Sequence, residues 1–176
     1  MKILVHACCG PCLIFPHEQL KEKGHAVTAF YYNPNIHPAG EYKSRLASFI
    51  KYCEVEGVTA IEAGYDANDY FDKIDADTPD RCRLCYRIRL MKTAKVAAAS
   101  GYDSFTTTLL VSPYQKHDDL RAAGEEAALA SGVPFFYEDF RPGFRAGRTK
   151  AREMGLYSQK YCGCRFSEEE RNRRSS

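Results

Sequence analysis

The amino-acid sequence predicts an α/β fold with a mostly parallel five-stranded sheet and helices on both faces. Short runs rich in β-branched and aromatic residues alternate with longer segments of helical periodicity. Two of the predicted helices end just before a glycine, the usual C-terminal signal. Hydrophobic residues make up 44% of the chain and charged residues 27%, which is typical of a soluble globular protein. Strict strand–helix alternation favours a sheet covered on both sides.

The first half of the chain predicts three strands and two helices. Lys2–Ala7 is a short apolar strand, residues 12–23 form a helix, and Ala26–Tyr32 forms a second strand, which makes a βαβ unit. Apolar residues recur at helical spacing over Gly40–Glu56, and Val58–Ala63 follows as a third strand.

The second half continues the alternation. Residues 66–80 are rich in aspartate and predict a solvated connection with one helical turn at most. Arg83–Ser100 predicts a helix, Asp103–Leu110 a strand, His117–Ser131 a helix and Val133–Tyr137 the fifth strand. No repeat or linker divides the chain, so residues 1–176 are expected to form one domain.

The charge of the chain is unevenly distributed. The net charge is +2, yet residues 141–176 hold ten Lys and Arg against four Glu, so we expect a basic C-terminal segment. Such a segment suits a phosphate backbone, although a solvated helix face gives the same pattern. No stretch approaches the length of a membrane span, and the apolar N-terminal run is too short for a secretory signal. We therefore expect a cytoplasmic protein in a reducing compartment.

Seven of the eight cysteines fall into three tight clusters. One zinc ion takes four ligands, so seven clustered thiols instead favour an iron–sulfur cluster with thiolates left for a second metal. Structural zinc and a thiol–disulfide catalyst are the alternatives. The eighth, Cys53, lies in an apolar helical stretch and is expected to be a buried hydrophobe. The predicted metal ligands are Cys8, Cys9, Cys12, Cys82, Cys85, Cys162 and Cys164.

The clusters occupy positions where ligands bind in parallel sheets. Cys8-Cys9-Gly10-Pro11-Cys12 follows the first strand and opens the first helix, whose positive end favours thiolates. Cys82 and Cys85 are three residues apart at a helix start and so face one side. Gly163 permits a turn between Cys162 and Cys164. The nearby arginines 81, 83, 87 and 89 could offset thiolate charge, bind substrate phosphates or form a solvated helix face.

Polar and aromatic residues follow the second and fourth predicted strands. Their neutral hydrogen-bonding groups suit a sugar or base, and Tyr32 and Tyr114 could stack on a nucleobase, although ordinary turn chemistry gives similar sequences. His6, inside the first strand, is expected to be a bonded core histidine. The predicted substrate-binding residues are Tyr32, Asn33, Asn35, Glu41, Arg45, Thr107, Ser112 and Gln115.

The chain resembles QueH-type epoxyqueuosine reductases almost from end to end. The resemblance implies a HUP-like α/β domain that reduces epoxyqueuosine to queuosine at the tRNA wobble position without cobalamin. The matching motifs are His6-Ala7-Cys8-Cys9-Gly10-Pro11-Cys12, Tyr32-Asn33-Pro34-Asn35-Ile36, Glu41-Tyr42-x-x-Arg45, Arg81-Cys82-x-x-Cys85-Tyr86, Thr107-x-x-x-x-Ser112-Pro113, Glu138-Asp139-Phe140-Arg141 and Tyr161-Cys162-Gly163-Cys164.

The resemblance also implies a cofactor, namely a [4Fe-4S] cluster beside a further iron held by two cysteines and a carboxylate. Some members carry Asp where this chain has Cys12, so a sulfur replaces the oxygen ligand or the second site is altered. All seven clustered cysteines are expected to be ligands, with none assigned to a particular metal. Tyr161 and Asp139 are the candidate proton donors, and a low-potential electron donor is implied.

Two other functions remain open at this stage. The predicted fold matches ATP-using tRNA thiolases, but Cys8-Cys9-Gly10-Pro11-Cys12 stands where their Ser-Gly-Gly-x-Asp-Ser type phosphate loop would lie, which disfavours ATP use. The third candidate is a non-catalytic, metal-dependent RNA-binding module. Turnover of epoxide-bearing tRNA separates a reductase from that module.

Overall fold

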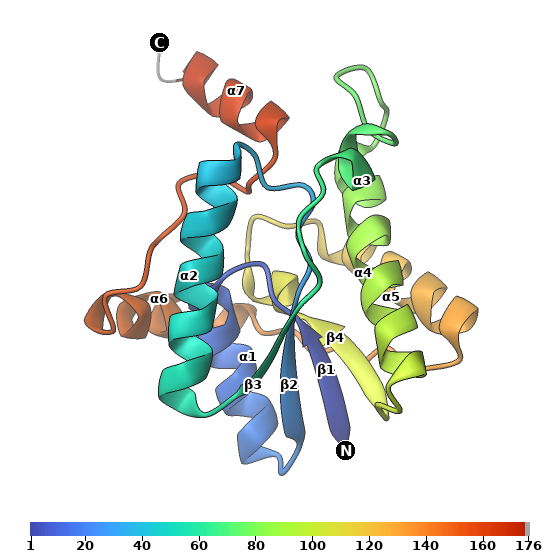
Figure 1. The fold of residues 1–176 in the computed structure, drawn as a ribbon, viewed down its shortest axis with the longest axis vertical. Coiled ribbons are helices and arrows are strands. Elements are labelled where there is room, and N and C mark those ends of the chain that lie inside the picture. The colour runs from blue at the N-terminus through green and yellow to red at the C-terminus, as the bar shows by residue number, and fades with distance from the viewer. Residues whose placement is uncertain (175–176) are drawn as a thin grey trace.

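The computed structural model describes residues 1–174 and contains a parallel sheet with the strand order β3-β2-β1-β4 (Figure 1). The α/β class is confirmed, but the described residues form four strands rather than five. Ile3, Leu4 and Val5 of the central strand are fully buried, as expected of a parallel strand covered on both faces. The strands are β1 (Lys2–His6), β2 (Ala26–Tyr31), β3 (Thr59–Glu62) and β4 (Ser104–Thr107).

The prediction of a fifth strand at Val133–Tyr137 is wrong, although the segment does run beside β4. It forms one parallel bridge, between Phe105 and Phe135, through two backbone hydrogen bonds of 3.1 and 2.8 Å. Pro134 has no N–H to donate, so a continuous ladder cannot form there.

Helices cover both faces of the sheet (Figure 1). One face carries α1 (Gly10–Glu22), α2 (Ala39–Glu56) and α6 (Phe144–Glu153), and the other carries α4 (Arg81–Ala99) and α5 (His117–Ser131). The remaining helices are α3 (Asn68–Phe71), η1 (Thr108–Val111), η2 (Arg141–Gly143) and α7 (Arg165–Arg174). Within the described range, no helix combines the length and apolar character of a membrane span.

Helices α6 and α7 lie in the segment expected only to be basic. Helix α6 buries Gly147 and Ala151, two small residues four positions apart, against α1. Gly143 just before it has no room for a Cβ, which would lie 2.0 Å from the ring of Phe15. This contact depends on small residues, which face α1, while the basic residues of α6 lie on its other side.

Candidate metal centre

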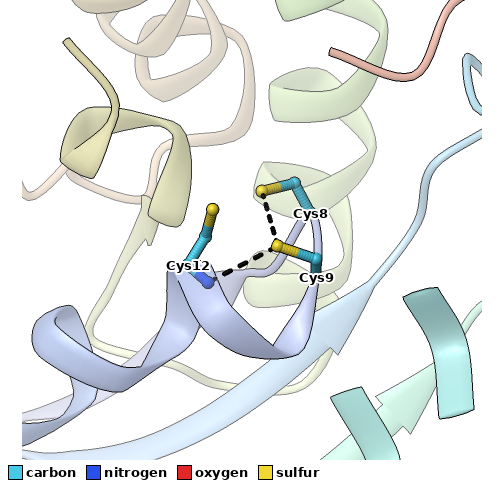
Figure 2. A group of neighbouring side chains, drawn as sticks. All are labelled: Cys8, Cys9 and Cys12. Atoms are coloured by element: carbon cyan, nitrogen blue, oxygen red, sulfur yellow. Dashed lines mark hydrogen bonds between the residues drawn. The ribbon is translucent and has the colours of Figure 1, made fainter. Parts of the chain in front are cut away.

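Cys8, Cys9 and Cys12 lie together where β1 passes into α1 (Figure 2). Their sulfur atoms all lie within 4.8 Å of one another, which is close enough to hold a single metal ion. Cys8 and Cys9 are buried and Cys12 is partly buried. The expected convergence of this first cluster is confirmed.

The local sequence explains this geometry. Cys9 is the N-cap of α1, and its Sγ accepts a hydrogen bond of 3.4 Å from the Cys12 backbone N–H. Gly10 lets α1 approach α2 closely, because a Cβ there would lie 2.4 Å from the carbonyl oxygen of Ser48. The helix starts at Gly10, two residues before the predicted start, so Cys12 lies in its first turn.

The environment of the first cluster favours a thiolate on Cys8. Hydrogen bonds from Cys12 and then Cys9 lower its pKa well below the usual value, and the same interactions raise the pKa of Cys12. Thr108 adds a second anchor: its Oγ1 accepts from the Cys8 N–H at 3.1 Å and donates to the Cys8 Sγ at 3.4 Å. Cys8 is therefore prepared to bind a cation.

The other four clustered cysteines line a small cavity of about 70 Å³, called the smaller space below. Cys82 and Cys85 reach it from the first turns of α4, and Cys162 and Cys164 reach it from the loop before α7. The Cys162 and Cys164 sulfurs are 3.9 Å apart, and this contact lowers the pKa of Cys162 to about 5. The two helical cysteines thus reach one site, as their spacing predicts.

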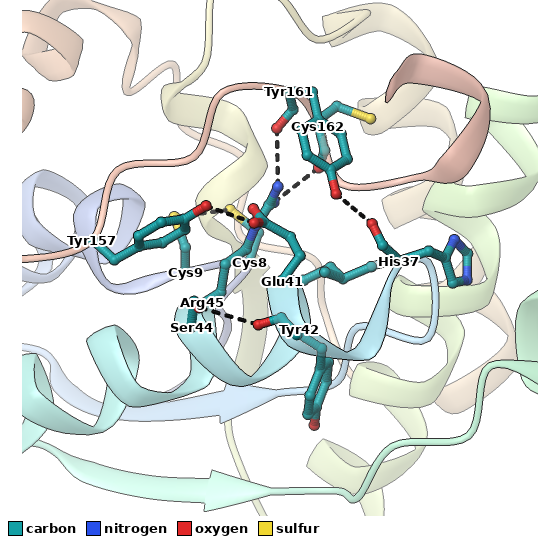
Figure 3. A network of polar contacts seen from close by, with 12 residues as sticks. Cys8, Cys9, His37, Glu41, Tyr42, Ser44, Arg45, Tyr157, Tyr161 and Cys162 are labelled. Atoms are coloured by element: carbon teal, nitrogen blue, oxygen red, sulfur yellow. Dashed lines mark hydrogen bonds and ion pairs between the residues drawn. The ribbon is translucent and has the colours of Figure 1, made fainter. Parts of the chain in front are cut away.

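Arg45 fixes the C-terminal cysteine loop (Figure 3). Its side chain is fully buried on α2 and donates to the carbonyl oxygens of Cys162 and Tyr161, both at 3.0 Å. Its Nε donates to Glu41 at 2.7 Å, and the other Glu41 oxygen accepts from the Tyr157 hydroxyl at 2.6 Å. All of these interactions are internal, so the arrangement gives Glu41 and Arg45 a supporting role and does not support the predicted substrate contact.

Gly163 completes the loop. Its φ of +124° lies in a region that favours glycine, and a Cβ there would approach Arg45 Nη1 to 3.1 Å. The Gly163 carbonyl accepts from the His37 N–H at 2.8 Å, and the Tyr161 hydroxyl donates to the His37 carbonyl. The backbone between Cys162 and Cys164 is therefore held from both sides.

A larger cavity of about 650 Å³ opens beside the thiols. Cys12 and Cys162 line it, so it touches both groups of cysteines. Tyr161 lines it too, and burial raises the pKa of that phenol to about 12, which keeps it protonated at neutral pH. Ser112 and Gln115, two of the predicted substrate-binding residues, also line this cavity.

Four other predicted substrate-binding residues lie in the protein interior, and none of them lines either cavity. The Tyr32 hydroxyl donates to Asp69 at 2.8 Å, and Asn33 donates to the Ala7 carbonyl at 2.9 Å. Asn35 is buried, and Thr107 pairs with His6 at 2.9 Å. His6 also bonds the Tyr32 carbonyl, so its expected role as a bonded core histidine is confirmed.

Asp139 does not suit the predicted role of proton donor. Its carboxylate lies on the surface and makes a two-point ion pair with Arg141, at 2.8 and 2.6 Å. The Arg141 guanidinium lowers the pKa of Asp139 to about 2. An acid that is ionised at neutral pH has no proton to give.

Sequence reasoning missed or did not single out three residues at the centre. Thr108 contacts Cys8, whereas the motif-matching Thr107 faces His6. Arg89 is buried and donates toward the Cys85 sulfur at 3.5 Å. Tyr70 lines the smaller space from α3. The spacing of Arg89, four residues after Cys85 on one helix, is a signal that could have distinguished it from its neighbours.

The donor set fits a sulfur-ligated iron centre. Soft thiolates select iron–sulfur clusters. Five of the seven clustered cysteines line the two cavities, which share Cys162, and the sulfurs of Cys8 and Cys9 lie within 4.8 Å of that of Cys12. A buried cation, Arg89, lines the smaller of these spaces and can balance thiolate charge.

Comparison with known proteins gives a consistent result. Residues 3–170 match the family model described as "Epoxyqueuosine reductase QueH". A protein of that name from Dehalococcoides mccartyi is 40% identical over 97% of this chain and 94% of its own length. Another from Thermotoga maritima is 33% identical over 94% of this chain and 89% of its own length.

Solved structures share the fold at low sequence identity. The U34-tRNA thiolase NcsA from Methanococcus maripaludis, solved with its [4Fe-4S] cluster, has a TM-score of 0.62 and 15% identity, covering 95% of this chain and 61% of its own. A "predicted subunit of tRNA methyltransferase" from Methanocaldococcus jannaschii has a TM-score of 0.60 and 14% identity, covering 98% and 88%. These likenesses support the α/β fold alone.

Proposed function

This chain belongs to the family of QueH epoxyqueuosine reductases, and from that premise we propose that it reduces epoxyqueuosine to queuosine at the wobble position of tRNA. The reaction removes the epoxide oxygen as water, which consumes two electrons and two protons. The observation that carries the proposal is the 650 Å³ cavity that opens directly onto Cys12 and Cys162. A substrate in this cavity lies beside both groups of thiols. A tRNA substrate and reduced metal-binding thiols support the proposal that the protein works in a reducing cytoplasm.

We propose that the seven clustered cysteines hold a [4Fe-4S] cluster and an adjacent iron, with no part for cobalamin. When bound, this centre supplies single electrons and a Lewis acid for the epoxide oxygen, and an external low-potential donor replenishes the electrons. Cys12 stands among three sulfurs within 4.8 Å, so it is placed as a third sulfur donor where some relatives carry a carboxylate.

The residues of the cavity have the chemistry to position a nucleoside. Ser112 and Gln115 offer neutral hydrogen-bonding groups, and Tyr114 is 82% exposed beside Phe144, with ring centroids 5.9 Å apart. Exposed rings of this kind stack on unpaired bases. Arg148 also lines the cavity and can pair with a phosphate.

Tyr161 is the better of the two candidate proton donors. Tyr161 lines the cavity, and its phenol remains protonated at neutral pH. Its hydroxyl donates to the His37 carbonyl, so it can deliver its proton to a developing alkoxide once this hydrogen bond opens, and water in the open cavity can then reprotonate it.

A thiolase-like use of ATP has one observation in its favour, the shared fold with a U34-tRNA thiolase. The N-terminus of α1, where such folds bind phosphate, is instead occupied by Cys9 as N-cap and by Cys12 in the first turn. The thiols at this helix N-terminus favour binding of a metal over binding of a phosphate.

The test is turnover of epoxyqueuosine-containing tRNA under anaerobic conditions with a chemical reductant, followed by mass spectrometry of the nucleosides. We expect queuosine from protein that contains iron and acid-labile sulfide, and a loss of at least about 100-fold for Cys9→Ala. Cys53→Ala is the matched control, because Cys53 is a buried cysteine of α2 outside the clusters. Iron-loaded protein that binds the tRNA without turnover would instead support a non-catalytic RNA-binding module.

A further inference from the structure

We propose that Arg89 is the internal counter-charge of the cysteine centre and raises the reduction potential of the iron bound there. This inference rests on the proposed function. Arg89 follows Cys85 by four residues and Cys82 by seven on α4, so all three lie on the same helix face. That face lines the smaller of the two spaces.

The guanidinium of Arg89 is buried without a carboxylate partner. The residue is 4% exposed, and among residues 1–174 it forms no ion pair. Its Nη1 lies 3.5 Å from the Cys85 sulfur, and its buried Nε has no hydrogen-bond partner. A buried charge needs a compensating charge nearby. Among residues 1–174, the acid that lines the smaller space, Glu170, is paired with Arg81, and the other groups that line this space and can carry a negative charge at neutral pH are thiols.

The lining of the smaller space identifies those sulfurs. Cys82, Cys85, Cys162 and Cys164 line it together with Arg89. These four cysteines come from two separate sequence clusters, one on α4 and one in the loop before α7. Arg89 therefore acts on both pairs of cysteines rather than on one.

The other arginines of α4 differ in their surroundings. Arg81 also lines the smaller space, but it is paired with Glu170 at 2.7 Å. Arg87 pairs with Glu126 at 2.5 Å, and both side chains are more than two-fifths exposed. Arg83 is exposed. Arg89 is thus the buried arginine of α4 whose positive charge is balanced by thiols and not by a carboxylate or solvent.

A fixed positive charge favours the more reduced state of a nearby metal centre, because each added electron makes that centre more negative. Net charge and hydrogen bonds to sulfur are known determinants of iron–sulfur potentials. The effect is strong in a buried site, where the effective dielectric is low. Arg89 donates toward the Cys85 sulfur and adds positive charge to the space that Cys82, Cys162 and Cys164 also line.

The test compares Arg89→Met, Arg89→Lys and the surface control Arg87→Gln in anaerobically reconstituted full-length protein. The readouts are iron content and the midpoint potential, from a redox titration followed by electron paramagnetic resonance. For Arg89→Met we expect at least a tenfold less favourable reduction, about 59 mV for a one-electron couple. Arg89→Lys should recover most of this shift, and Arg87→Gln should match the wild type.

The remaining results of this experiment either overturn or support the proposed role of Arg89. An Arg89→Met protein with full iron content and the wild-type potential overturns the proposal. If Arg89→Met loses iron but Arg89→Lys retains it, the positive charge is what the centre requires, which supports the proposal. If both variants lose iron equally, the shape of the arginine side chain and not its charge is required, which overturns the proposal. Wild-type protein that takes up no iron contradicts the proposed function itself, which is visible before any variant is compared.

Discussion

Arg45 is a single buried residue that supports the cysteine loop. Its Nη1 and Nη2 link α2 to the backbone of the loop that carries Cys162 and Cys164, and its Nε bonds Glu41 on the same helix. Glu41 balances its charge from one helical turn away. The paired motif Glu41-Tyr42-x-x-Arg45 is therefore explained by support of the cysteine loop.

We expect Arg45→Met to destabilise the protein by about 3–5 kcal/mol, because the largely covered Glu41 loses its cationic partner and two carbonyls lose their donors. Urea unfolding measures the free energy, and iron content should fall with it. Arg121→Met is the matched control. Arg121 and Glu125 form another i,i+4 helix pair, but both side chains are more than half exposed, so the expected loss is below about 1 kcal/mol. Equal losses in the two variants would contradict the role assigned to Arg45.

The cysteine clusters could be predicted from residue type, and Cys8, Cys9 and Cys12 do lie together at the carboxyl end of β1. Cys162 and Cys164 follow a helix, so the strand-end rule does not account for their place beside Cys82 and Cys85. That all seven are metal ligands stays a prediction. The substrate residues were harder to predict. Tyr32, Asn33 and Thr107 carry suitable groups, but their side chains bond inside the protein. Sequence cannot show which way a side chain at a strand end faces when both faces of the sheet are covered.

Tyr114 is the exposed aromatic residue that borders the large cavity. We expect Tyr114→Ala to raise KM for tRNA about tenfold with little change in kcat, because one stacking contact is worth about 1–3 kcal/mol. Tyr114→Phe should restore binding. Leu129→Ala is the control, since Leu129 is 88% exposed near the C-terminal end of α5. If Tyr114→Ala has the same KM for tRNA as the wild type, Tyr114 does not contribute to tRNA binding.

At the scale of elements, the sequence predicts those whose pattern is local and regular. The four observed strands and helices α1, α2, α4 and α5 were expected within a few residues. Helix α6 was not predicted because its segment was interpreted only by its charge, although the buried Gly147 and Ala151 and the basic residues give it an amphipathic pattern. The prediction of a fifth strand was wrong because Pro134 has no backbone N–H to donate at the position where pairing with β4 would continue.

The closest helix contact near the site is that of α1 on α2 at Gly10. We expect Gly10→Ala to cost about 1–3 kcal/mol, since the new methyl would meet the Ser48 carbonyl oxygen at 2.4 Å and push the first turn away. Thermal unfolding gives the stability, and reactivity of Cys12 with a thiol reagent reports the displacement.

Gly147→Ala on α6 provides the contrast. A Cβ there has its nearest neighbours at 3.7 Å, so the methyl fits. Alanine also favours a helix over glycine by up to about 1 kcal/mol. We therefore expect a small stabilisation. If Gly10→Ala is as stable as Gly147→Ala, α1 and α2 can move apart enough to accommodate the methyl group without a loss of stability.

For the whole molecule, buried histidines make stability depend on pH. Burial lowers the pKa of His6 to about 3 and that of His37 to about 4, against 6.5 in the unfolded chain. Between these values the unfolded state binds more protons than the folded state, so the stabilisation is fully present above pH 6.5 and is lost as the pH falls.

We expect His6 to account for a loss of roughly 2 kcal/mol between pH 6.5 and about 5, at 1.36 kcal/mol per unit. Urea unfolding at several pH values measures this slope. His6→Gln should be less stable than the wild type at pH 7 but should show a shallower decline. An unchanged slope would mean that other groups control acid sensitivity.

The separation of the cysteine clusters along the chain has a consequence for biosynthesis. Cys8 and Cys9 leave the ribosome early, whereas Cys162 and Cys164 leave after all four strands have been made, and Arg45 can hold their loop only once α2 has folded. If all seven cysteines hold the proposed centre, iron delivered to a nascent chain would meet an incomplete set of sulfurs. We therefore expect cofactor insertion to follow translation and a prematurely terminated chain to fail to retain the centre.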